Sequence, residues 1–293
     1  MIPPLGLLLD VDGPVSSPLK RRIAIRSIID DLVTLASTGV PIAFITGRSD
    51  TFMRDEVVAP LLGAGLPDGI RMFGVSEKGG VWFPITGEGM GDITVDSELA
   101  LPDEYTAEFR EIAEARFSEE MFFDDTKHAM ISLEQNKDAS AADFRAAQEQ
   151  VNQVAFDLLV EHGLGARYAD QEFPDADGLI NFRVDPTIIS TDVESVLLDK
   201  DRGAARALDY FRESGDMPTL WRTVGDSRSD YLMADYLHDE GFDVAHVDVR
   251  PSDGILHRPY RVITEGNLIH DEAGAAFLRH WVRALGSHSG GIA

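Results

Sequence analysis

The chain of 293 residues is 44% hydrophobic and 26% charged, and it contains no cysteine. This composition is typical of a soluble globular protein with a substantial core, and it excludes disulfides, thiolate zinc sites and cysteine nucleophiles. The net charge of −25 opposes binding to nucleic acid or to anionic lipid, so we expect neither nucleic acid nor a membrane as a partner.

No apolar run approaches the ~20 residues that are needed to cross a bilayer. The N-terminal residues 1–9 lack the basic start of a signal peptide and lead directly into an acidic motif. We therefore expect a cytoplasmic location.

The N-terminal segment predicts a strand, a helix and a second strand. Residues 6–13 form an apolar run that ends in two aspartates and a glycine, which is typical of a strand buried on both faces. Residues 25–35 carry apolar side chains at helical spacing, and Gly39 suits the end of that helix. Residues 42–47 form another apolar run, and Ser49 is suited to cap the next helix. This order indicates a parallel sheet.

The same alternation returns near the C-terminus, whereas the middle of the chain differs. In the C-terminal part we expect a helix at 201–213, a strand at 220–224, a helix from Ser229, a strand at 244–249 and a disordered tail from Gly286. In the middle we expect helices at 103–117 and 140–161 and strands at 127–134, 166–169 and 179–185. We predict an α/β fold: a Rossmann-like core with a parallel sheet, residues 1–83 and 192–293, and an inserted α+β cap domain, residues 84–191.

Polar side chains follow three of the predicted core strands. They are Asp10, Asp12 and Gly13 after the first strand, Thr46, Gly47 and Arg48 after the second, and Gly225, Asp226 and Asp230 near the C-terminus. Each acidic residue alone is typical of a turn or a helix cap, but the carboxyl ends of parallel strands meet at one edge of a sheet, where ligands bind. Carboxylates suit Mg²⁺, which bridges to phosphoryl oxygens. Thr46 and the amides of the glycine turn can donate hydrogen bonds to phosphate.

A phosphate site in so acidic a chain needs local positive charge, and lysine is scarce. The five lysines are Lys20, Lys78, Lys127, Lys137 and Lys200. Lys200 lies just before a predicted core helix, where it is either a solvated residue of the helix N-terminus or a phosphate contact. Beside the three strand ends we favour phosphate contact, with Lys78 as the alternative lysine.

These residues together resemble the four motifs of the haloacid dehalogenase-like superfamily. The motifs are Asp10-x-Asp12-Gly13, Thr46, Lys200, and Gly225-Asp226 with Asp230, and they occur in the family's order. The insertion between the second and third motifs resembles the cap of the branch with trehalose-, sucrose- and mannosylglycerate-phosphate phosphatases, Cof-type phosphatases and phosphomannomutases. Residues 76–80 resemble the Glu/Asn-x-Gly segment that leads into that cap. Two features depart from the pattern: Pro14 follows Gly13, and two residues separate Lys200 from Gly203.

The resemblance implies a role for each matched residue. Asp10 is the implied nucleophile, which forms an aspartyl-phosphate, and Asp12 is the implied acid/base for the leaving oxygen and then for water. The implied phosphate ligands are Thr46, Gly47 and Lys200. The implied Mg²⁺ ligands are Asp10, Asp12, Asp226 and Asp230, the last either directly or through water. Asp12 favours a phosphatase, because dehalogenases of the superfamily lack an aspartate at that position.

The cap is expected to determine substrate specificity, because such a lid closes over the leaving group. Candidate substrate contacts in it are Lys127, His128, Glu172 and Arg183, although each also fits an ordinary surface or structural role. The sequence thus predicts a Mg²⁺-dependent phosphomonoesterase that acts on a small phosphorylated metabolite, and the cap type favours a sugar phosphate.

Two other functions compete with this hypothesis. A phosphomutase of the phosphomannomutase type would use the same residues to move phosphate between positions of a hexose. A non-catalytic receiver-like or metabolite-binding module also presents acidic residues, a threonine and a lysine at strand ends, but Asp12 and the large insertion argue against it. The sequence does not reveal the oligomeric state.

Overall fold

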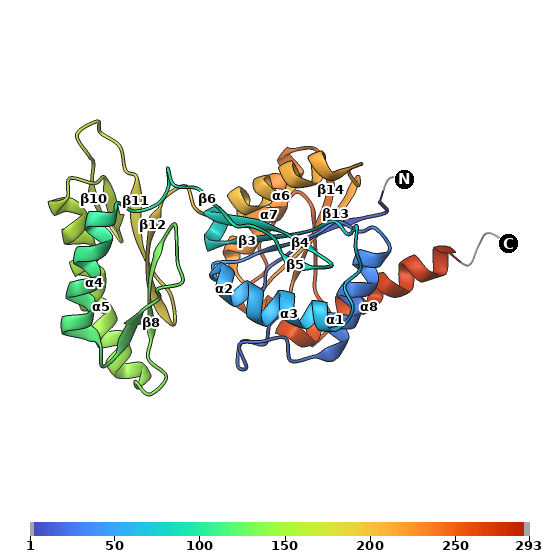
Figure 1. Cartoon of the computed structure of the whole chain (residues 1–293), viewed down its shortest axis with the longest axis horizontal. Coiled ribbons are helices and arrows are strands. Elements are labelled where there is room, and N and C mark those ends of the chain that lie inside the picture. Colours follow the sequence, from blue (N-terminus) through green and yellow to red (C-terminus); the bar gives the residue numbers. More distant parts are fainter. Residues whose placement is uncertain (1–2, 290–293) are drawn as a thin grey trace. The chain divides into compact units, whose positions relative to one another are not determined.

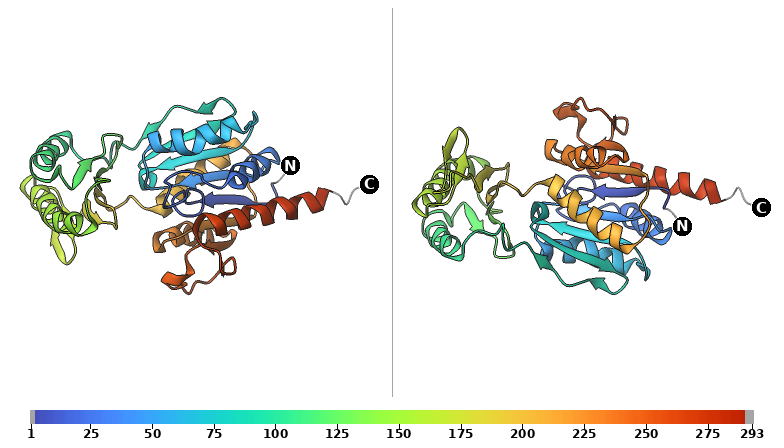
Figure 2. Two further views of the ribbon diagram at one scale, coloured as in Figure 1. Left: turned by 90° about the horizontal axis from the view of Figure 1, so that it is seen from below. Right: turned by 90° about the horizontal axis from the view of Figure 1, so that it is seen from above.

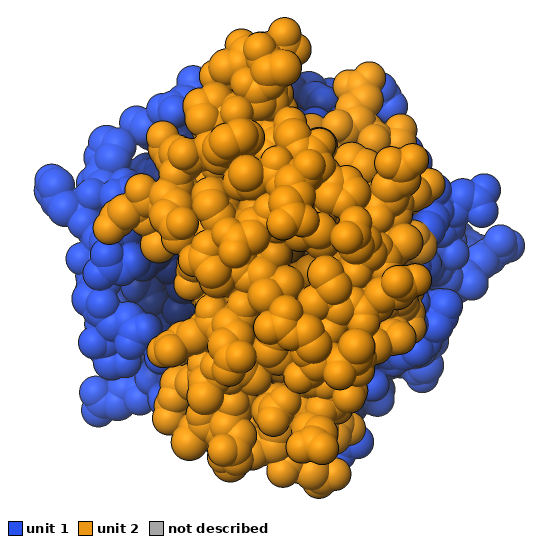
Figure 3. Space-filling model, turned by 90° about the vertical axis from the view of Figure 1, so that its left-hand side faces the viewer, with its two compact units in different colours: residues 1–94, 199–293 blue, residues 95–198 orange. Residues whose placement is uncertain are grey.

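A computed structural model of the chain describes the backbone of residues 3–289 and the side chains of residues 3–286. The chain forms two compact units, which divide between Thr94 and Val95 and again between Leu198 and Asp199 (Figure 3). The expected boundaries at 84 and 191 fall inside strands β4 (Val81–Thr86) and β12 (Ser190–Ser195). The inserted unit begins later than we expect from the sequence, because β4 completes a hairpin with the core sheet before the chain leaves it.

The first unit contains a mixed sheet with the strand order β15-β14-β13-β1-β2-β3-β4-β5, and β6 pairs with β4 (Figure 1). Its strands are β1 (Gly6–Leu9), β2 (Ile42–Ile45), β3 (Met72–Ser76), β4, β5 (Gly89–Met90), β6 (Thr94–Val95), β13 (Leu220–Gly225), β14 (Asp243–Asp248) and β15 (Arg261–Ile263). The strands from β15 to β3 run parallel, whereas β4 is antiparallel to β3. This arrangement confirms the predicted α/β class.

Helices cover both faces of this sheet (Figure 2). The helices of the first unit are α1 (Arg26–Ser37), α2 (Asp50–Phe52), η1 (Met53–Val58), α3 (Ala59–Gly63), η2 (Glu77–Gly79), α6 (Lys200–Ser214), η3 (Arg228–Asp230), α7 (Tyr231–Asp239), η4 (Pro251–Asp253) and α8 (His270–Ser289). Leu7 and Leu9 pack with α1, α3 and α8, whereas Leu8 packs with α6 and α7. The apolar run of β1 therefore supplies two cores, one on each face of the sheet.

The second unit is an α+β fold with the strand order β10-β9-β11-β12-β8-β7. Its elements are α4 (Asp103–Phe117), β7 (Met121–Phe123), β8 (Ile131–Gln135), α5 (Ala141–Glu161), β9 (Ala166–Tyr168), β10 (Gln171–Phe173), β11 (Phe182–Pro186) and β12. Tyr105, Phe109 and Phe144 lie fully buried in its core, which α4 and α5 share with the sheet. The inserted unit thus has a hydrophobic core of its own.

The C-terminal helix α8 continues to Ser289, so residues 286–289 are helical and the disorder expected there is wrong for them. The last residues, 290–293, lie outside the described part of the chain. Among the described helices, none combines the length and the apolar character that crossing a membrane requires.

Trp221 on β13 is the largest fully buried side chain of the core, and it packs near Phe211 and Phe242. We expect Trp221→Ala to lower the free energy of unfolding by ~3–5 kcal/mol, because it leaves a cavity among these rings. Urea denaturation of Trp221→Ala and of Leu19→Ala measures this, since Leu19 is 96% exposed in the same unit. A loss below ~1 kcal/mol in Trp221→Ala would contradict the described packing.

Candidate active site

Three parallel strands bring the predicted site residues to one edge of the core sheet. Strand β1 lies between β2 and β13, and Asp10, Thr46 and Asp226 directly follow these three strands. The amide of Asp10 donates to the carbonyl oxygen of Val224 at 2.8 Å, which fixes Asp10 against the end of β13. The carboxyl ends of the strands therefore meet as the sequence predicts.

Lys200 binds the residues from these strands together. It is the first residue of α6, and its Nζ lies 2.5 Å from Asp10 Oδ1, 2.8 Å from Asp230 Oδ1 and 2.7 Å from the carbonyl oxygen of Ile45. The ammonium group donates hydrogen bonds to Asp10 and to the Ile45 carbonyl oxygen, and it forms an ion pair with Asp230. The interpretation of Lys200 as a solvated helix-start residue is therefore wrong, since the side chain is buried at the strand ends.

Asp230 is held rigidly by the turn after β13. Its Oδ2 accepts hydrogen bonds from the amides of Asp226 and Ser227 at 3.0 and 2.9 Å and from the Ser227 hydroxyl at 2.8 Å. A Cβ at Gly225 would lie 2.1 Å from the Cβ of Asp230, so this turn requires glycine. The turn leaves Asp230 Oδ1 directed at Lys200.

The cluster holds more negative than positive charge. Carboxylate oxygens of Asp10, Asp226 and Asp230 lie within 4.8 Å of one another. Burial raises the pKa of Asp10 well above its usual range, and the Asp230 carboxylate adds to the rise. Burial and Asp230 together raise the pKa of Asp226 to about 6. One lysine thus offsets only part of the charge of three carboxylates.

Lys200 and Asp230 form the fully ionised pair within this cluster. Burial opposes the charged form of both residues, yet the attraction of Asp10 and then Asp230 prevails for Lys200, and the attraction of Lys200 prevails for Asp230. The pKa of Lys200 is therefore raised and the pKa of Asp230 lowered. The excess negative charge remains on Asp10 and Asp226, where hard carboxylate oxygens suit a divalent cation such as Mg²⁺.

Asp12 lies beside this cluster in a bidentate ion pair with Arg48. Arg48 Nε donates to Asp12 Oδ2 at 2.9 Å and Arg48 Nη2 to Asp12 Oδ1 at 3.1 Å. The Arg48 guanidinium also lies over the ring of Phe52, 5.0 Å from its centroid. Directly after Asp12 the chain turns at Gly13, which has φ +97° and whose Cβ would lie 2.6 Å from Asp226 Oδ2.

The turn after β2 presents Thr46 and Gly47. Thr46 is buried, and its hydroxyl oxygen accepts the Arg48 amide at 3.1 Å, so its own O–H can donate to a ligand. A Cβ at Gly47 would lie 3.6 Å from Cε of Lys78, which places the aliphatic part of that lysine over the turn. Ser49 caps the following helix through the Phe52 amide at 3.3 Å, as predicted.

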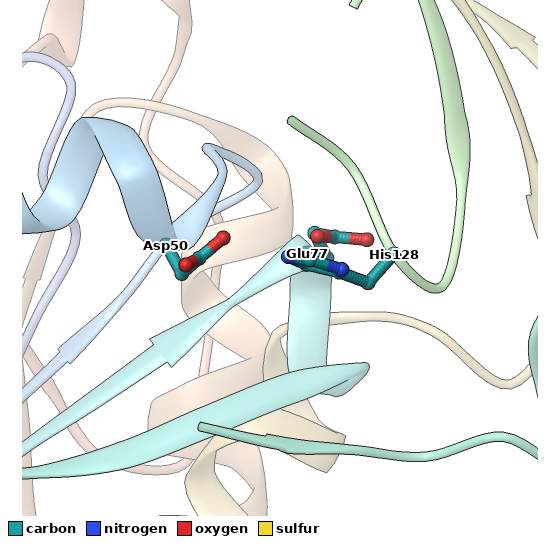
Figure 4. Close-up of side chains that lie close together, drawn as sticks. All are labelled: Asp50, Glu77 and His128. Atoms are coloured by element: carbon teal, nitrogen blue, oxygen red, sulfur yellow. The ribbon is translucent and has the colours of Figure 1, made fainter. Parts of the chain in front are cut away.

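Asp50 and Glu77 form a second pair of buried carboxylates in the same unit. Asp50 begins α2, and Glu77 begins η2 directly after β3 (Figure 4). A carboxylate oxygen of one lies within 4.8 Å of one of the other. Neither carboxylate belongs to the four motifs, and Glu77 lies in the segment 76–80 that leads toward the insertion.

The four cap candidates occupy different settings within the second unit. Lys127 and His128 lie between β7 and β8, and Glu172 is exposed on β10 opposite Arg167. Arg183 on β11 donates to the fully buried Glu194 at 2.6 Å and to the carbonyl oxygen of Leu198 at 2.8 Å. These bonds give Arg183 a structural role in the unit's sheet.

The sequence did not reveal the pairing of Arg48 with Asp12 or the presence of His270 at the site. Arg48 directly follows Thr46-Gly47, so its place in the turn was visible, but its pairing with Asp12 depends on the approach of two strands. His270 at the start of α8 lies with Nδ1 3.3 Å from Asp226 Oδ2. No local pattern marks His270, because only the path of the C-terminal segment brings it there.

No sequence-family model matches the chain, and no curated protein matches it in sequence. Solved structures do match its fold. The C-terminal domain of C. albicans trehalose-6-phosphate phosphatase has TM-score 0.65 and 12% identity, covering 96% of this chain and 93% of that one. A haloacid dehalogenase-like hydrolase from Bacteroides thetaiotaomicron has TM-score 0.56 and 13% identity, covering 94% and 98%. The Aspergillus fumigatus trehalose-6-phosphate phosphatase has TM-score 0.51 and 15% identity, covering 96% and 93%.

The chain has the haloacid dehalogenase-like fold. This agrees with the family resemblance of its motifs and with an α+β unit inserted into the Rossmann-like core. At 12–15% identity, the similarity to these solved structures shows the fold and not the reaction. The reaction depends on the side chains of the site.

The charge excess predicts a pH-dependent stability. The pKa of Asp226 is about 6 in the folded chain against an ordinary 3.8, so the folded state gains from protonation at low pH and loses stability as pH rises through about 6. We expect Asp226→Asn to remove this loss and to stabilise the metal-free protein at pH 7 by at most ~3 kcal/mol.

Urea denaturation in EDTA at pH 4.5 and pH 7 measures the effect. The exposed Asp239→Asn serves as the control, and it should follow the wild type at both pH values. Equal pH dependence in Asp226→Asn and wild type would contradict the charge excess.

Proposed function

We propose that this protein is a divalent-cation-dependent phosphomonoesterase that acts through an aspartyl-phosphate at Asp10, with Mg²⁺ as the cation. The observation that carries the proposal is the Lys200 bridge, which fixes Asp10 and Asp230 at the strand ends beside Asp226. The fold that the chain shares with haloacid dehalogenase-like hydrolases supports it.

Asp10 is the proposed nucleophile. Lys200 holds Oδ1 at 2.5 Å, so Oδ2 is the oxygen that attacks phosphorus. The bond from phosphorus to the ester oxygen breaks, and the phosphoryl group passes to Asp10 as an acyl phosphate. Water then attacks this phosphorus and releases inorganic phosphate and the free carboxylate.

Asp12 is the group that moves protons in both steps. It gives a proton to the leaving oxygen and takes one from the attacking water. Arg48 orients Asp12 through both carboxylate oxygens, so at least one of these bonds has to open for the transfer. The Asp12 side chain is 36% exposed, which keeps it within reach of substrate and water.

Thr46 and Gly47 are the proposed phosphate ligands, through the hydroxyl of Thr46 and the amides of the turn. Lys200 Nζ is held in this structure by hydrogen bonds to Asp10 and the Ile45 carbonyl oxygen and by the ion pair with Asp230. Lys200 therefore acts first by orienting Asp10, and it contacts phosphate only if it exchanges one of these acceptors.

Asp10 and Asp226 are the proposed direct ligands of Mg²⁺. Asp230 uses Oδ2 in three hydrogen bonds and Oδ1 on Lys200, which favours an orienting role over direct binding. Asp12 is the remaining candidate ligand. Because Arg48 occupies both oxygens of its carboxylate, we propose that Asp12 would contact Mg²⁺ through its backbone carbonyl oxygen. Bound Mg²⁺ supplies charge neutralisation between the carboxylates and the phosphoryl oxygens.

The proposed substrate is a small phosphorylated metabolite, with a sugar phosphate preferred. The similarity of the fold to trehalose-6-phosphate phosphatases supports this class. The inserted unit, residues 95–198, supports it as well. Lys127, His128, Glu172 and Arg183 remain the proposed contacts to the leaving group. The proposed location is the cytoplasm, where such metabolites occur.

A panel of phosphorylated metabolites, including trehalose 6-phosphate, assayed with Mg²⁺ tests the proposal through release of inorganic phosphate. Asp10→Asn should lose more than ~100-fold in kcat, because the nucleophile is gone while the strand end stays ordered. The exposed Asp239→Asn is the matched control and should keep wild-type activity.

The same assay separates the competing functions. A phosphomutase would isomerise a hexose phosphate with little phosphate release, and a receiver-like module would turn over none of the esters. Asp10→Asn activity within tenfold of wild type would rule out Asp10 as the nucleophile.

Activity should require Mg²⁺ and disappear in EDTA while the fold survives. Ca²⁺ should inhibit, because it accepts more ligands at longer distances and loosens the in-line arrangement. Kinetics with each cation, together with circular dichroism in EDTA, measure both effects. Full activity in EDTA would contradict a role for the cation.

A further inference from the structure

Lys78 lies against the phosphate turn through both its backbone and its side chain. Its amide donates to the carbonyl oxygen of Thr46 at 3.0 Å, and the Glu77 amide donates to that of Arg48 at 3.1 Å. The Lys78 Cε lies 3.6 Å from the position of a Cβ on Gly47. Because Gly47 has no side chain, the lysine can extend across the turn.

The backbone that carries Lys78 is strained. Glu77 and Lys78 have φ values of +51° and +54°, in the left-handed region that favours glycine. A side chain in this region brings its Cβ too close to the backbone, so both residues are less stable there than in a relaxed conformation. A strained lysine at a ligand-binding turn points to a role of its side chain in the site.

The site is negatively charged, so binding of phosphate requires additional positive charge. Asp10, Asp12 and Asp226 repel an incoming phosphate dianion, and the chain as a whole carries −25. The Lys200 ammonium is matched by Asp10, Asp230 and the Ile45 carbonyl, and Arg48 is paired with Asp12. The side chain of Lys78 lies over Gly47, so it brings further positive charge to this turn.

We propose that Lys78 is a second substrate-binding lysine, whose ammonium group contacts the phosphoryl group of a phosphomonoester held by Thr46 and Gly47. This proposal rests on the proposed phosphomonoesterase function. It differs from the role of Lys200, which holds the nucleophile, because Lys78 binds the incoming group itself. Hydrogen bonds from an ammonium to phosphate are charge-assisted and hence strong.

Inorganic phosphate is the probe, and its binding with Mg²⁺ present is measured by calorimetry and by competitive inhibition. Lys78→Asn removes the charge and keeps a residue that tolerates the left-handed conformation. Lys78→Arg restores the charge, and Lys20→Asn is the control at an exposed lysine of the same unit. If Lys78→Asn does not fold, Lys78→Gly relieves the strain and removes the same ammonium group.

We expect Lys78→Asn to weaken phosphate binding and raise KM by ~10- to 100-fold, with a smaller change in kcat. Lys78→Arg should stay within about fivefold of wild type and Lys20→Asn within about twofold. Phosphate binding within twofold of wild type in Lys78→Asn or Lys78→Gly overturns the proposal. If such a variant also has a lower melting temperature, Lys78 stabilises the fold by offsetting the charges of Asp50 and Glu77 and does not bind phosphate.

The two proposals fail separately. A wild type that binds phosphate but hydrolyses no ester would refute the phosphomonoesterase function, and the binding data would still decide the role of Lys78. A wild type that does not bind phosphate overturns both.

Discussion

The Lys200 ion pair with Asp10 and Asp230 is the interaction on which the site depends. It joins the end of β1 to the turn after β13 and to the start of a helix that follows the inserted unit. Breaking a buried ion pair by removing one partner is strongly destabilising, because a charge then remains buried without compensation. Lys200 therefore fixes the geometry of the nucleophile and also the connection between distant parts of the chain.

The strongly negative chain and a phosphate ligand are compatible because charge acts locally. Buried charges interact far more strongly than surface charges, which water and salt screen. At the strand ends, three carboxylates surround one lysine, and burial together with the Asp230 carboxylate raises the pKa values of Asp10 and Asp226. A divalent cation and a lysine beside the turn both reduce this imbalance, so the proposed Mg²⁺ and the proposed role of Lys78 address the same physical need.

Much of the core was predictable because its strands are apolar and end in polar motifs. The run Leu7-Leu8-Leu9 indicated a buried strand, and the parallel order then placed Asp10 near Asp226. Strand β12 was missed because all of its residues except Val193 are polar. Asp192 in this strand accepts hydrogen bonds from Ser132 and Ser190 within the sheet. The pairing of Arg48 with Asp12 and the contacts of Lys200 could not be predicted from local patterns, because each joins segments that are far apart in the sequence.

The central claim is that Asp10 receives the phosphoryl group, and chemical trapping of the intermediate tests it most directly. An acyl phosphate on an aspartate is reduced by borohydride to homoserine, which changes the mass of one peptide. The enzyme is incubated with Mg²⁺ and an ester that it hydrolyses, quenched during turnover and then reduced. We predict homoserine at position 10 and nowhere else. Modification at another carboxylate, or none during sustained turnover, would contradict the account.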